Sequence, residues 1–332
     1  MLKRGPRNLI TDVDGIFVGH AADGRVRTGV TVVLPDPPAL AAVDVRGGAP
    51  GTRETDALNP TCMVDRIDAI CLSGGSAFGL DAASGVMAAL AVAGKGLSVG
   101  NFRVPIVPAA ILFDLANGGA KDWGMEPPYR ALGIAALGAV GRDFPLGNVG
   151  AGFGAAAGRL KGGLGSASTI DDTGLQVGAL ICVNPVGSVL WPGSGRLLAA
   201  ELAAGDDIGP QPPAGPVPPS FDLPAESRLA GHTCIGVVAT NLALDKAQAQ
   251  RIAIMAHDGL ARAIRPVHTP LDGDTIFTLS TGRQALPEPK GHALARLGHI
   301  AADCVSRAVA RAVVSAESLG STPSYRSRFP TG

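Results

Sequence analysis

A threonine near the three-quarter point of the chain stands where a self-activating nucleophile could form. Thr233 opens the apolar segment TCIGVVATN, and a proline-rich run, GPQPPAGPVPPSFDLPAESRLA, fills residues 209–230 just before it. If the peptide bond before Thr233 broke, its hydroxyl would lie beside a free α-amine, a general base with a reference pKa of about 7.7–8.0. The hydroxyl could also attack the His232 carbonyl, which would make the cleavage intramolecular. The alternative is a β-branched residue that only begins a strand.

Three further motifs carry polar groups that suit such a nucleophile. In LDGDT, Asp272 and Asp274 flank a turn, so one carboxylate could orient the α-ammonium or the hydroxyl while the other holds a proton. In CVNPVG, the Asn184 amide could donate to an oxyanion, a contribution of about 2.7–4 kcal/mol at a transition state. In RLKGGLGSAS, Lys161 could hold a carboxylate or help to activate Thr233. Ordinary Asp-Gly and Asn-Pro turns and a solvated turn lysine are the structural alternatives.

Other side chains that could react fit catalysis less well. Ser76 in SGGSAFG lies at a strand-to-helix turn, but its spacing is GxSxxG and not the G-x-S-x-G of a nucleophile elbow. That turn is better suited to face a ligand through N–H groups at a helix start. Cys234 follows Thr233 on a strand, where neighbours face opposite sides, so it is expected in the core. His268 is expected to be structural or to support a catalytic group.

The composition indicates one large or two ordinary domains with a sizeable core, since 46% of the 332 residues are hydrophobic. The net charge is +0 without a basic or acidic block, so nothing points to nucleic acid or an anionic membrane. Five cysteines with no CxxC and no metal spacing predict reduced thiols in the cytoplasm and neither metal nor cofactor. No signal peptide is expected, since residues 1–6 lack an apolar core, and no membrane span is expected, because Asp81 and glycines interrupt the apolar stretch 69–94.

Apolar periodicity predicts strands and helices on both sides of a linker that precedes Thr233. The linker, residues 204–230, is expected to be extended and exposed because proline recurs through it. The part after the linker is expected to share one core with the part before it, since its helix faces are too apolar to stand alone. Strands are predicted at 28–34, 69–75, 234–239 and 274–281, within the glycine-dense stretch 147–168, and as a strand, turn and strand over 177–191. Helices are predicted at 76–93, 111–116, 129–140, 245–265 and 294–314.

Segments spread along nearly the whole chain carry a family resemblance. They are NLITDVDGIFVGHA, TGVTVVL, VRGGAPGTRETD, ICLSGGSAFGLDAASGV, VPIVPAAILFDL, GNVGAGFGAA with KGGLGSAS, CVNPVGSV, HTCIGVVATN, AHDGLARAI and PVHTPLDGDTIFTLSTG. Together they resemble the DmpA-type aminopeptidases (L-aminopeptidase/D-esterase), whose relatives include β-peptidyl aminopeptidases and nylon-oligomer hydrolases. Any single segment would be a weak match, whereas the combination is specific.

The resemblance implies an α/β (α+β) fold of the αββα sandwich type, shared with the ornithine acetyltransferases. It also implies a precursor that cuts itself before Thr233 into an α chain of residues 1–232 and a β chain of residues 233–332. The two chains would share a single core, and αβ units of this family usually assemble as tetramers. Substrates would be short peptides, amides or esters with a free amino end.

The resemblance further implies roles for individual residues. Asn184 would donate a hydrogen bond to the oxyanion, and Asp272 and Asp274 would be the catalytic acids. Lys161, in preference to Arg159, would fill the position of the catalytic lysine. Ser76 and Phe113 are assigned to substrate binding.

Two residues depart from the family pattern. His232 precedes the cut where relatives often carry Asn or Gly, so a bulkier, titratable group lies next to the cleaved bond. Phe113 stands where the nylon-hydrolase branch has Tyr, so a phenolic hydroxyl is missing.

The function expected is that of a self-processing N-terminal-nucleophile amidohydrolase, an aminopeptidase that acts through an acyl-enzyme on Thr233. One alternative is an acyltransferase like the ornithine acetyltransferases, which would pass the acyl group to an amine instead of water. The other is a non-enzymatic binding protein that retains the fold, which would stay a single chain and show no turnover.

Overall fold

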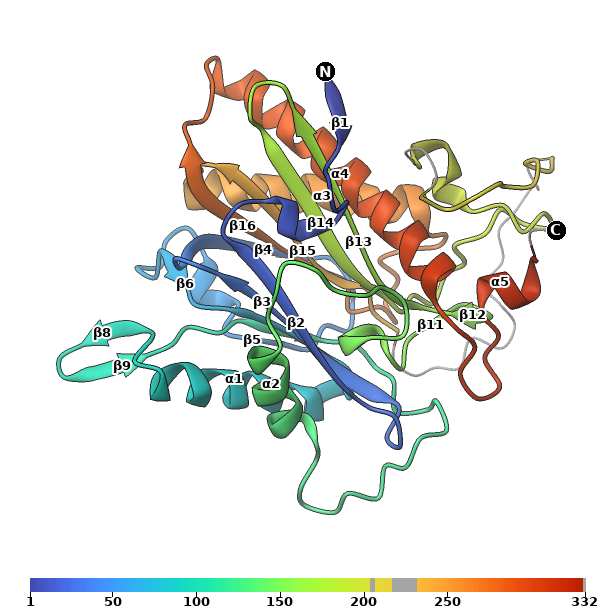
Figure 1. Ribbon diagram of the computed structural model, residues 1–332, viewed down its shortest axis with the longest axis horizontal. Helices are drawn as coiled ribbons and strands as arrows, with labels where there is room; N and C mark the ends of the chain where they lie inside the picture. Colours follow the sequence, from blue (N-terminus) through green and yellow to red (C-terminus); the bar gives the residue numbers. More distant parts are fainter. Residues whose placement is uncertain (204–206, 217–231, 331–332) are drawn as a thin grey trace.

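Two β-sheets packed face to face form the centre of the molecule, and helices cover the outer face of each (Figure 1). The computed structural model describes residues 1–203, 207–216 and 232–330. Helices α3 and α4 lie on the seven-stranded sheet, and α1 and α2 lie on the five-stranded sheet. The layers therefore run helix, sheet, sheet, helix, which confirms the predicted αββα sandwich. The helices are α1 (Asp81–Val92), α2 (Tyr129–Gly138), α3 (Lys246–Ala263), α4 (Lys290–Ser315) and α5 (Tyr325–Arg328).

The strands form two large sheets and two small hairpins. The seven-stranded sheet has the order β1 (Leu2–Arg4), β13 (Gly163–Asp171), β14 (Gln176–Val183), β15 (Ile235–Leu242), β16 (Thr275–Gln284), β4 (Ala39–Val45), β6 (Arg66–Ile67). The five-stranded sheet has the order β2 (Ile16–Asp23), β3 (Thr28–Pro35), β7 (Ile70–Ser73), β10 (Ala109–Ile111), β5 (Thr52–Arg53). The hairpins are β8 (Leu97–Val99) with β9 (Phe102–Val104), and β11 (Ala156–Ala157) with β12 (Leu160–Lys161).

A parallel pair at the centre of the larger sheet positions the residues of the site. β15 and β16 run parallel with Ile235 opposite Thr275, and α3 forms the crossover between them. Because the two strands start at the same edge, the residues just before each strand meet there. Those residues are Thr233 and the LDGDT loop, which lie about 40 residues apart in the sequence.

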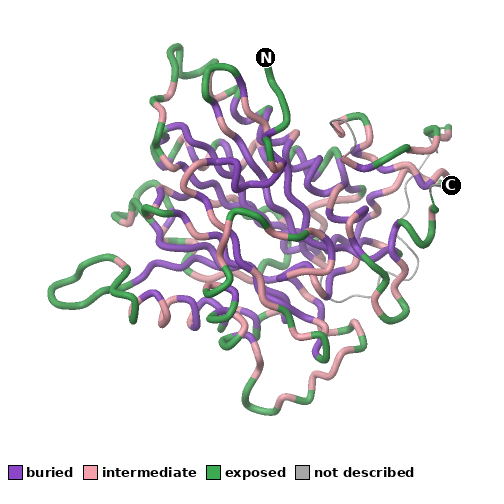
Figure 2. Tube along the Cα trace, viewed as in Figure 1, coloured by how far each residue is buried: buried purple, intermediate pink, exposed green. Residues whose placement is uncertain are grey.

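Buried side chains alternate between the two faces of the larger sheet. In β14, Leu180 lies in the core between the sheets and Ile181 in the core beneath α3 and α4. In β15, Val237 lies in the core between the sheets and Val238 in the core beneath α3 and α4. Both faces are covered, so these strands read as continuous apolar runs in the sequence. Figure 2 shows the buried trace concentrated in the sheets and the exposed trace in the outer loops.

Local signals in the sequence set the ends of α3. The Asp245 side chain accepts a hydrogen bond from the Gln248 N–H at 2.8 Å, and the Gln248 side chain accepts one from the Asp245 N–H at 3.1 Å. This capping box starts the helix, and the helix ends at Ala263, shortly before Pro266. In the described part of the chain, no helix is both long enough and apolar enough to cross a membrane.

Two predicted elements are wrong. The helix expected at 111–116 is absent: Ala109–Ile111 forms β10, which pairs with β7 and β5. A short apolar run does not distinguish a helix from a buried strand, and here backbone pairing decided. The strand expected after Asn184 is also absent, since Ser188 and Leu190 make only isolated bridges, to Arg265 and Leu197.

The linker expected at 204–230 is only partly exposed where it is described. Residues 204–206 and 217–230 lie outside the described residues. Between them Ile208 is buried, and the Trp191 indole N–H donates to the Gly215 carbonyl at 3.0 Å. Arg196 donates to the Pro212 carbonyl at 3.0 Å. Residues 207–216 therefore pack on the protein, because backbone carbonyls of a proline-rich segment can still accept hydrogen bonds.

A close helix–sheet contact supports a first prediction. A methyl group at Gly165 in β13 would collide with the Ala308 carbonyl and lie 2.8 Å from the Ala312 methyl, both on α4. We expect Gly165→Ala to lower the free energy of unfolding by about 1–3 kcal/mol, because the helix must move off the sheet. Gly291→Ala is the control: it has open space around it, and its effect should stay within about 1 kcal/mol. Equal thermal melting curves for the two variants would contradict this packing.

Candidate active site

The Thr233 side chain contacts the peptide bond that would have to break. The residue is buried, and its N–H donates to the Asn184 carbonyl at 2.7 Å. Its hydroxyl donates to the carbonyl oxygen of His232. The Gly273 N–H lies 3.0 Å from the Thr233 hydroxyl oxygen and 3.1 Å from the His232 carbonyl oxygen. A hydroxyl, the adjacent carbonyl and a backbone donor are thus assembled at one point.

His232 is held as a short extension of the sheet. It forms a parallel bridge with Asp272, and its N–H donates to the Leu271 carbonyl at 3.4 Å. Burial lowers the pKa of its imidazole, which Asp272 partly opposes. The residue that departs from the family pattern is therefore a largely neutral side chain next to Thr233.

Asp274 anchors Cys234, the residue that follows Thr233. One carboxylate oxygen accepts from the Cys234 N–H at 2.7 Å. The other accepts from the His268 imidazole at 2.7 Å and from the His268 N–H at 3.1 Å. His268 thus supports an acid of the site, as expected. Asp274 fixes the backbone on one side of Thr233 and, within the described residues, does not bond Thr233 itself.

Asp272 anchors the turn on the other side. It accepts from the Val186 N–H at 3.1 Å, the Thr269 N–H at 3.0 Å and the Thr269 hydroxyl at 2.6 Å. Burial and then the neighbouring Asp274 raise the pKa of the Asp272 carboxyl, while these three donors lower it. The two aspartates of LDGDT thus fix the backbone around Thr233 from both sides.

Asn184 connects three segments at the site. Its side-chain amide donates to the Phe113 carbonyl at 3.0 Å, and its side-chain oxygen accepts from the Ala156 N–H at 2.9 Å. Its main-chain carbonyl receives the Thr233 N–H. The group that directly holds the nitrogen of Thr233 is therefore this backbone carbonyl.

Lys161 is buried, so the alternative of a solvated turn lysine is wrong. Its ammonium donates to the carbonyls of Gly152 at 3.1 Å and Gly162 at 3.2 Å. Burial lowers the pKa of Lys161 to about 7, and the charge of Asp114 partly offsets this. Such an amine can gain or lose a proton near neutral pH. Arg159, two residues earlier, lies exposed in the turn of the β11–β12 hairpin.

Comparison with known sequences decides the family. The sequence model of peptidase family S58 matches residues 8–325. The chain belongs to peptidase family S58. An uncharacterised aminopeptidase of Mycobacterium tuberculosis (strain ATCC 25618 / H37Rv) is 45% identical to this chain, and the match covers 97% of this chain and 98% of the relative. A 6-aminohexanoate-oligomer endohydrolase of Paenarthrobacter ureafaciens is 32% identical, over 88% of this chain and 80% of the relative.

Solved structures share the fold of the S58 chain. A β-aminopeptidase of Burkholderia sp. superposes with a TM-score of 0.69 at 23% identity, over 95% of this chain and 89% of that one. The L-aminopeptidase D-Ala-esterase/amidase of Ochrobactrum anthropi, described as a variant of the Ntn hydrolase fold, gives 0.68 at 24% identity, over 97% and 90%. The resemblance to the DmpA type is thereby confirmed. The S58 chain is an aminopeptidase or amidase, and neither alternative function is favoured.

Asp114, a buried acid that the sequence analysis missed, is hydrogen-bonded to the turn before Ser76, and its charge acts on the pKa of Lys161. Asp114 accepts from the Gly75 N–H at 2.8 Å and from the Thr28 hydroxyl at 2.7 Å, and burial raises the pKa of its carboxyl. Ser76 is half-buried with φ 52°, and its N–H donates to the Leu112 carbonyl at 2.9 Å. The only sign of Asp114 in the sequence is a single acid at the end of the apolar run VPIVPAAILF.

Phe113 and Cys234 also have defined places in the S58 chain. Phe113 is half-buried and meets the site through its carbonyl, which accepts from Asn184. Cys234 is fully buried in the core beneath α3 and α4, as expected from strand alternation. Burial raises the pKa of the Cys234 thiol, which keeps it protonated. Among the residues with described positions, no three His, Cys, Asp or Glu side chains are grouped as a metal site.

Proposed function

We propose that the chain cuts itself between His232 and Thr233 and that the new N-terminal Thr233 is the nucleophile toward substrate. The observation that supports this most strongly is the contact between the Thr233 hydroxyl and the His232 carbonyl oxygen. The products are an α chain of residues 1–232 and a β chain of residues 233–332. Both keep their places in one core, because β14 of the first chain pairs with β15 of the second.

Self-cleavage proceeds as an acyl shift. The Thr233 hydroxyl oxygen forms a bond to the His232 carbonyl carbon, and the Gly273 N–H stabilises the negative charge on the carbonyl oxygen. The bond to the Thr233 nitrogen breaks, and the hydroxyl proton ends on that nitrogen. Water then hydrolyses the ester, which leaves a carboxylate on His232 and a free amine on Thr233.

Substrate turnover repeats these steps on an incoming amide. The Thr233 amine accepts the hydroxyl proton and gives it to the leaving amine, and water releases the acyl group. We propose that the Gly273 N–H and the Asn184 amide share the oxyanion and that Lys161 assists proton transfer. Asp272 and Asp274 keep the backbone rigid around the nucleophile, so the reacting atoms stay aligned.

The substrate class proposed is short peptides, amides or esters with a free amino end, with Ser76 and Phe113 near the bound acyl group. The buried carboxylates of Asp114, Asp272 and Asp274 give this region a negative charge that favours an ammonium. A tetramer of αβ units and a cytoplasmic location are part of the same proposal.

Paired substrates test the free amino end. We expect alanine amide to be hydrolysed and N-acetylalanine amide to be slower by on the order of 100-fold or more in kcat/KM, because acetylation removes the charge. Both reactions are followed by ammonia release. Added ornithine should yield no acylornithine. Equal rates for the two amides would contradict the aminopeptidase assignment. Both hydrolysis and acyl transfer release ammonia, so the acyl product decides between them: alanylornithine in place of free alanine would favour the acyltransferase.

A further inference from the structure

A pocket of about 300 Å³ lies between the β11–β12 hairpin and the C-terminal segment around α5. Figure 1 shows these elements side by side. Leu160, Leu190 and Phe329 supply apolar wall, and Arg159 and Arg328 supply two positive groups. The pocket has the size and mixed lining of a small-ligand site. No residue that lines it takes part in the chemistry proposed for Thr233.

The two arginines are available to a ligand. Arg159 lies in the turn between β11 and β12, and Arg328 is the last residue of α5. Neither guanidinium has a hydrogen-bond or ion-pair partner among the residues that the structure describes. Two like charges at one pocket repel each other, and an anion between them removes that repulsion. A planar guanidinium fits a carboxylate with two parallel hydrogen bonds.

Two hydrogen bonds fix the C-terminal segment, one to the β11–β12 hairpin and one to the loop that follows Leu190. The Lys161 N–H at the end of the hairpin donates to the Pro323 carbonyl at 2.8 Å, just before α5. The Tyr325 hydroxyl donates to the Gly195 carbonyl at 3.1 Å. The segments that carry Arg159 and Arg328 are thus fixed relative to each other, and the pocket needs no rearrangement to form.

The pocket begins close to the nucleophile. The N–H of Gly158, which lines the pocket, donates to the Pro185 carbonyl at 3.5 Å. Pro185 follows Asn184, whose carbonyl holds the Thr233 nitrogen at 2.7 Å. One peptide unit separates the two hydrogen bonds, so Gly158 lies on the order of 10 Å from that nitrogen. The carboxylate of a one-residue leaving group and an extended arginine side chain together span such a distance.

We infer that this pocket binds the C-terminal carboxylate of the leaving residue, with Arg159 and Arg328 as its ligands and Leu160, Leu190 and Phe329 against the side chain. The inference rests on the proposed function, because it assigns the leaving side of the same substrate. Carboxylate binding in this pocket makes the enzyme selective for dipeptides and other very short peptides in which the carboxylate lies one residue beyond the cleaved bond.

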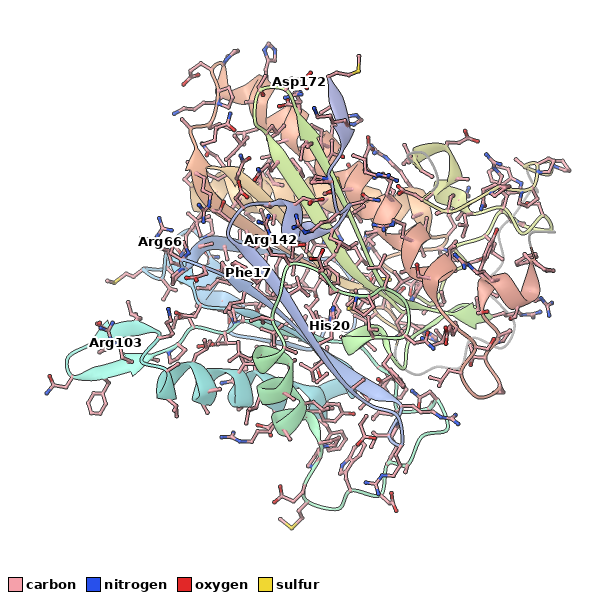
Figure 3. The ribbon with its side chains drawn as sticks, in the orientation of Figure 1. Phe17, His20, Arg66, Arg103, Arg142 and Asp172 are labelled. Carbon is pink, nitrogen blue, oxygen red and sulfur yellow. The ribbon has the colours of Figure 1, made fainter. Side chains whose placement is uncertain are left out.

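The test compares each dipeptide with its own C-terminal amide. For wild type, kcat/KM for Ala-Leu should exceed that for Ala-Leu amide by about 10-fold or more, mostly through KM. In Arg159→Gln, in Arg328→Gln and in the double variant, that ratio should fall toward one, and Arg328→Lys should restore part of it. The control is Arg103→Gln on the distant β8–β9 hairpin (Figure 3), which should keep the wild-type ratio.

A ratio near one in wild type, or one that the double variant leaves unchanged, would overturn the inference. A further substrate pair, Glu-Leu amide and Gln-Leu amide, tests whether the two arginines bind a carboxylate on the acyl side instead. A preference for Glu-Leu amide that depends on the same arginines would also overturn the inference. If wild type hydrolyses none of these peptides, the proposed function fails instead. Calorimetry of wild type with Ala-Leu and with Ala-Leu amide then tests the pocket by binding alone: tighter binding of Ala-Leu that is lost in the double arginine variant supports the inference, and equal binding overturns it.

Discussion

Thr233→Ala is expected to lower kcat/KM for aminoacyl amides by on the order of 10⁴-fold or more, because it removes the attacking oxygen. The same change should leave the chain uncut, since no hydroxyl then lies against the His232 carbonyl. Turnover is measured by ammonia release, and folding by circular dichroism and thermal melting.

Thr233→Ser is the matched control. It keeps the hydroxyl and loses one methyl group, so it should still cut and turn over substrate, more slowly. The alanine variant should stay folded, because the Thr233 hydroxyl bonds only to neighbouring backbone groups among the described residues. A folded alanine variant with wild-type turnover would contradict the role of Thr233.

Lys161→Met is expected to lower kcat by about 10²–10⁴-fold if the lysine amine moves a proton in the reaction. The pKa of Lys161 is lowered to about 7 by burial, so wild-type activity should rise as the pH passes through 7. This rise in the pH–activity profile should be absent in Lys161→Met. The rise caused by deprotonation of the Thr233 amine, with a reference pKa of about 7.7–8.0, should remain. Lys161→Arg keeps a charge at every pH and should be as inactive as Lys161→Met.

Stability gives a second readout for Lys161 that does not depend on activity. Between the folded pKa of about 7 and the unfolded pKa of about 10.4, the unfolded chain binds more protons at this residue. The free energy of unfolding of wild type should therefore rise with pH across that window, and that of Lys161→Met should lack this rise. Rescue of activity by Lys161→Arg, with the rise in the pH–activity profile retained, would show instead that a fixed positive charge is what the site uses.

The role proposed for Thr233 could be inferred from the sequence because it depends on neighbours in the sequence. A threonine that follows a proline-rich run and opens an apolar strand carries its own base once cut, and no tertiary information is needed to see this. The sandwich was predictable through the family resemblance, which the comparisons confirm. Helices such as α3 were predictable from their caps and apolar faces.

Other parts depended on contacts that the sequence does not display. The run around Ile111 pairs with β7, and pairing decides between helix and strand for a short apolar segment. The Gly273 N–H is a backbone donor whose position follows from the register of β15 against β16. Asp114 is a single acid after an apolar run, and only the fold brings the Gly75 turn and Thr28 to it.

The most direct test of the central claim is the intact mass of purified wild type together with N-terminal sequencing of its chains. Wild type should give two chains from the 33.3 kDa precursor, one of which begins TCIGVVATN. Thr233→Ala, analysed in parallel, should give the single uncut mass. A wild-type sample that is fully active as one uncut chain would contradict the account, because Thr233 would then have no free amine to act as its base.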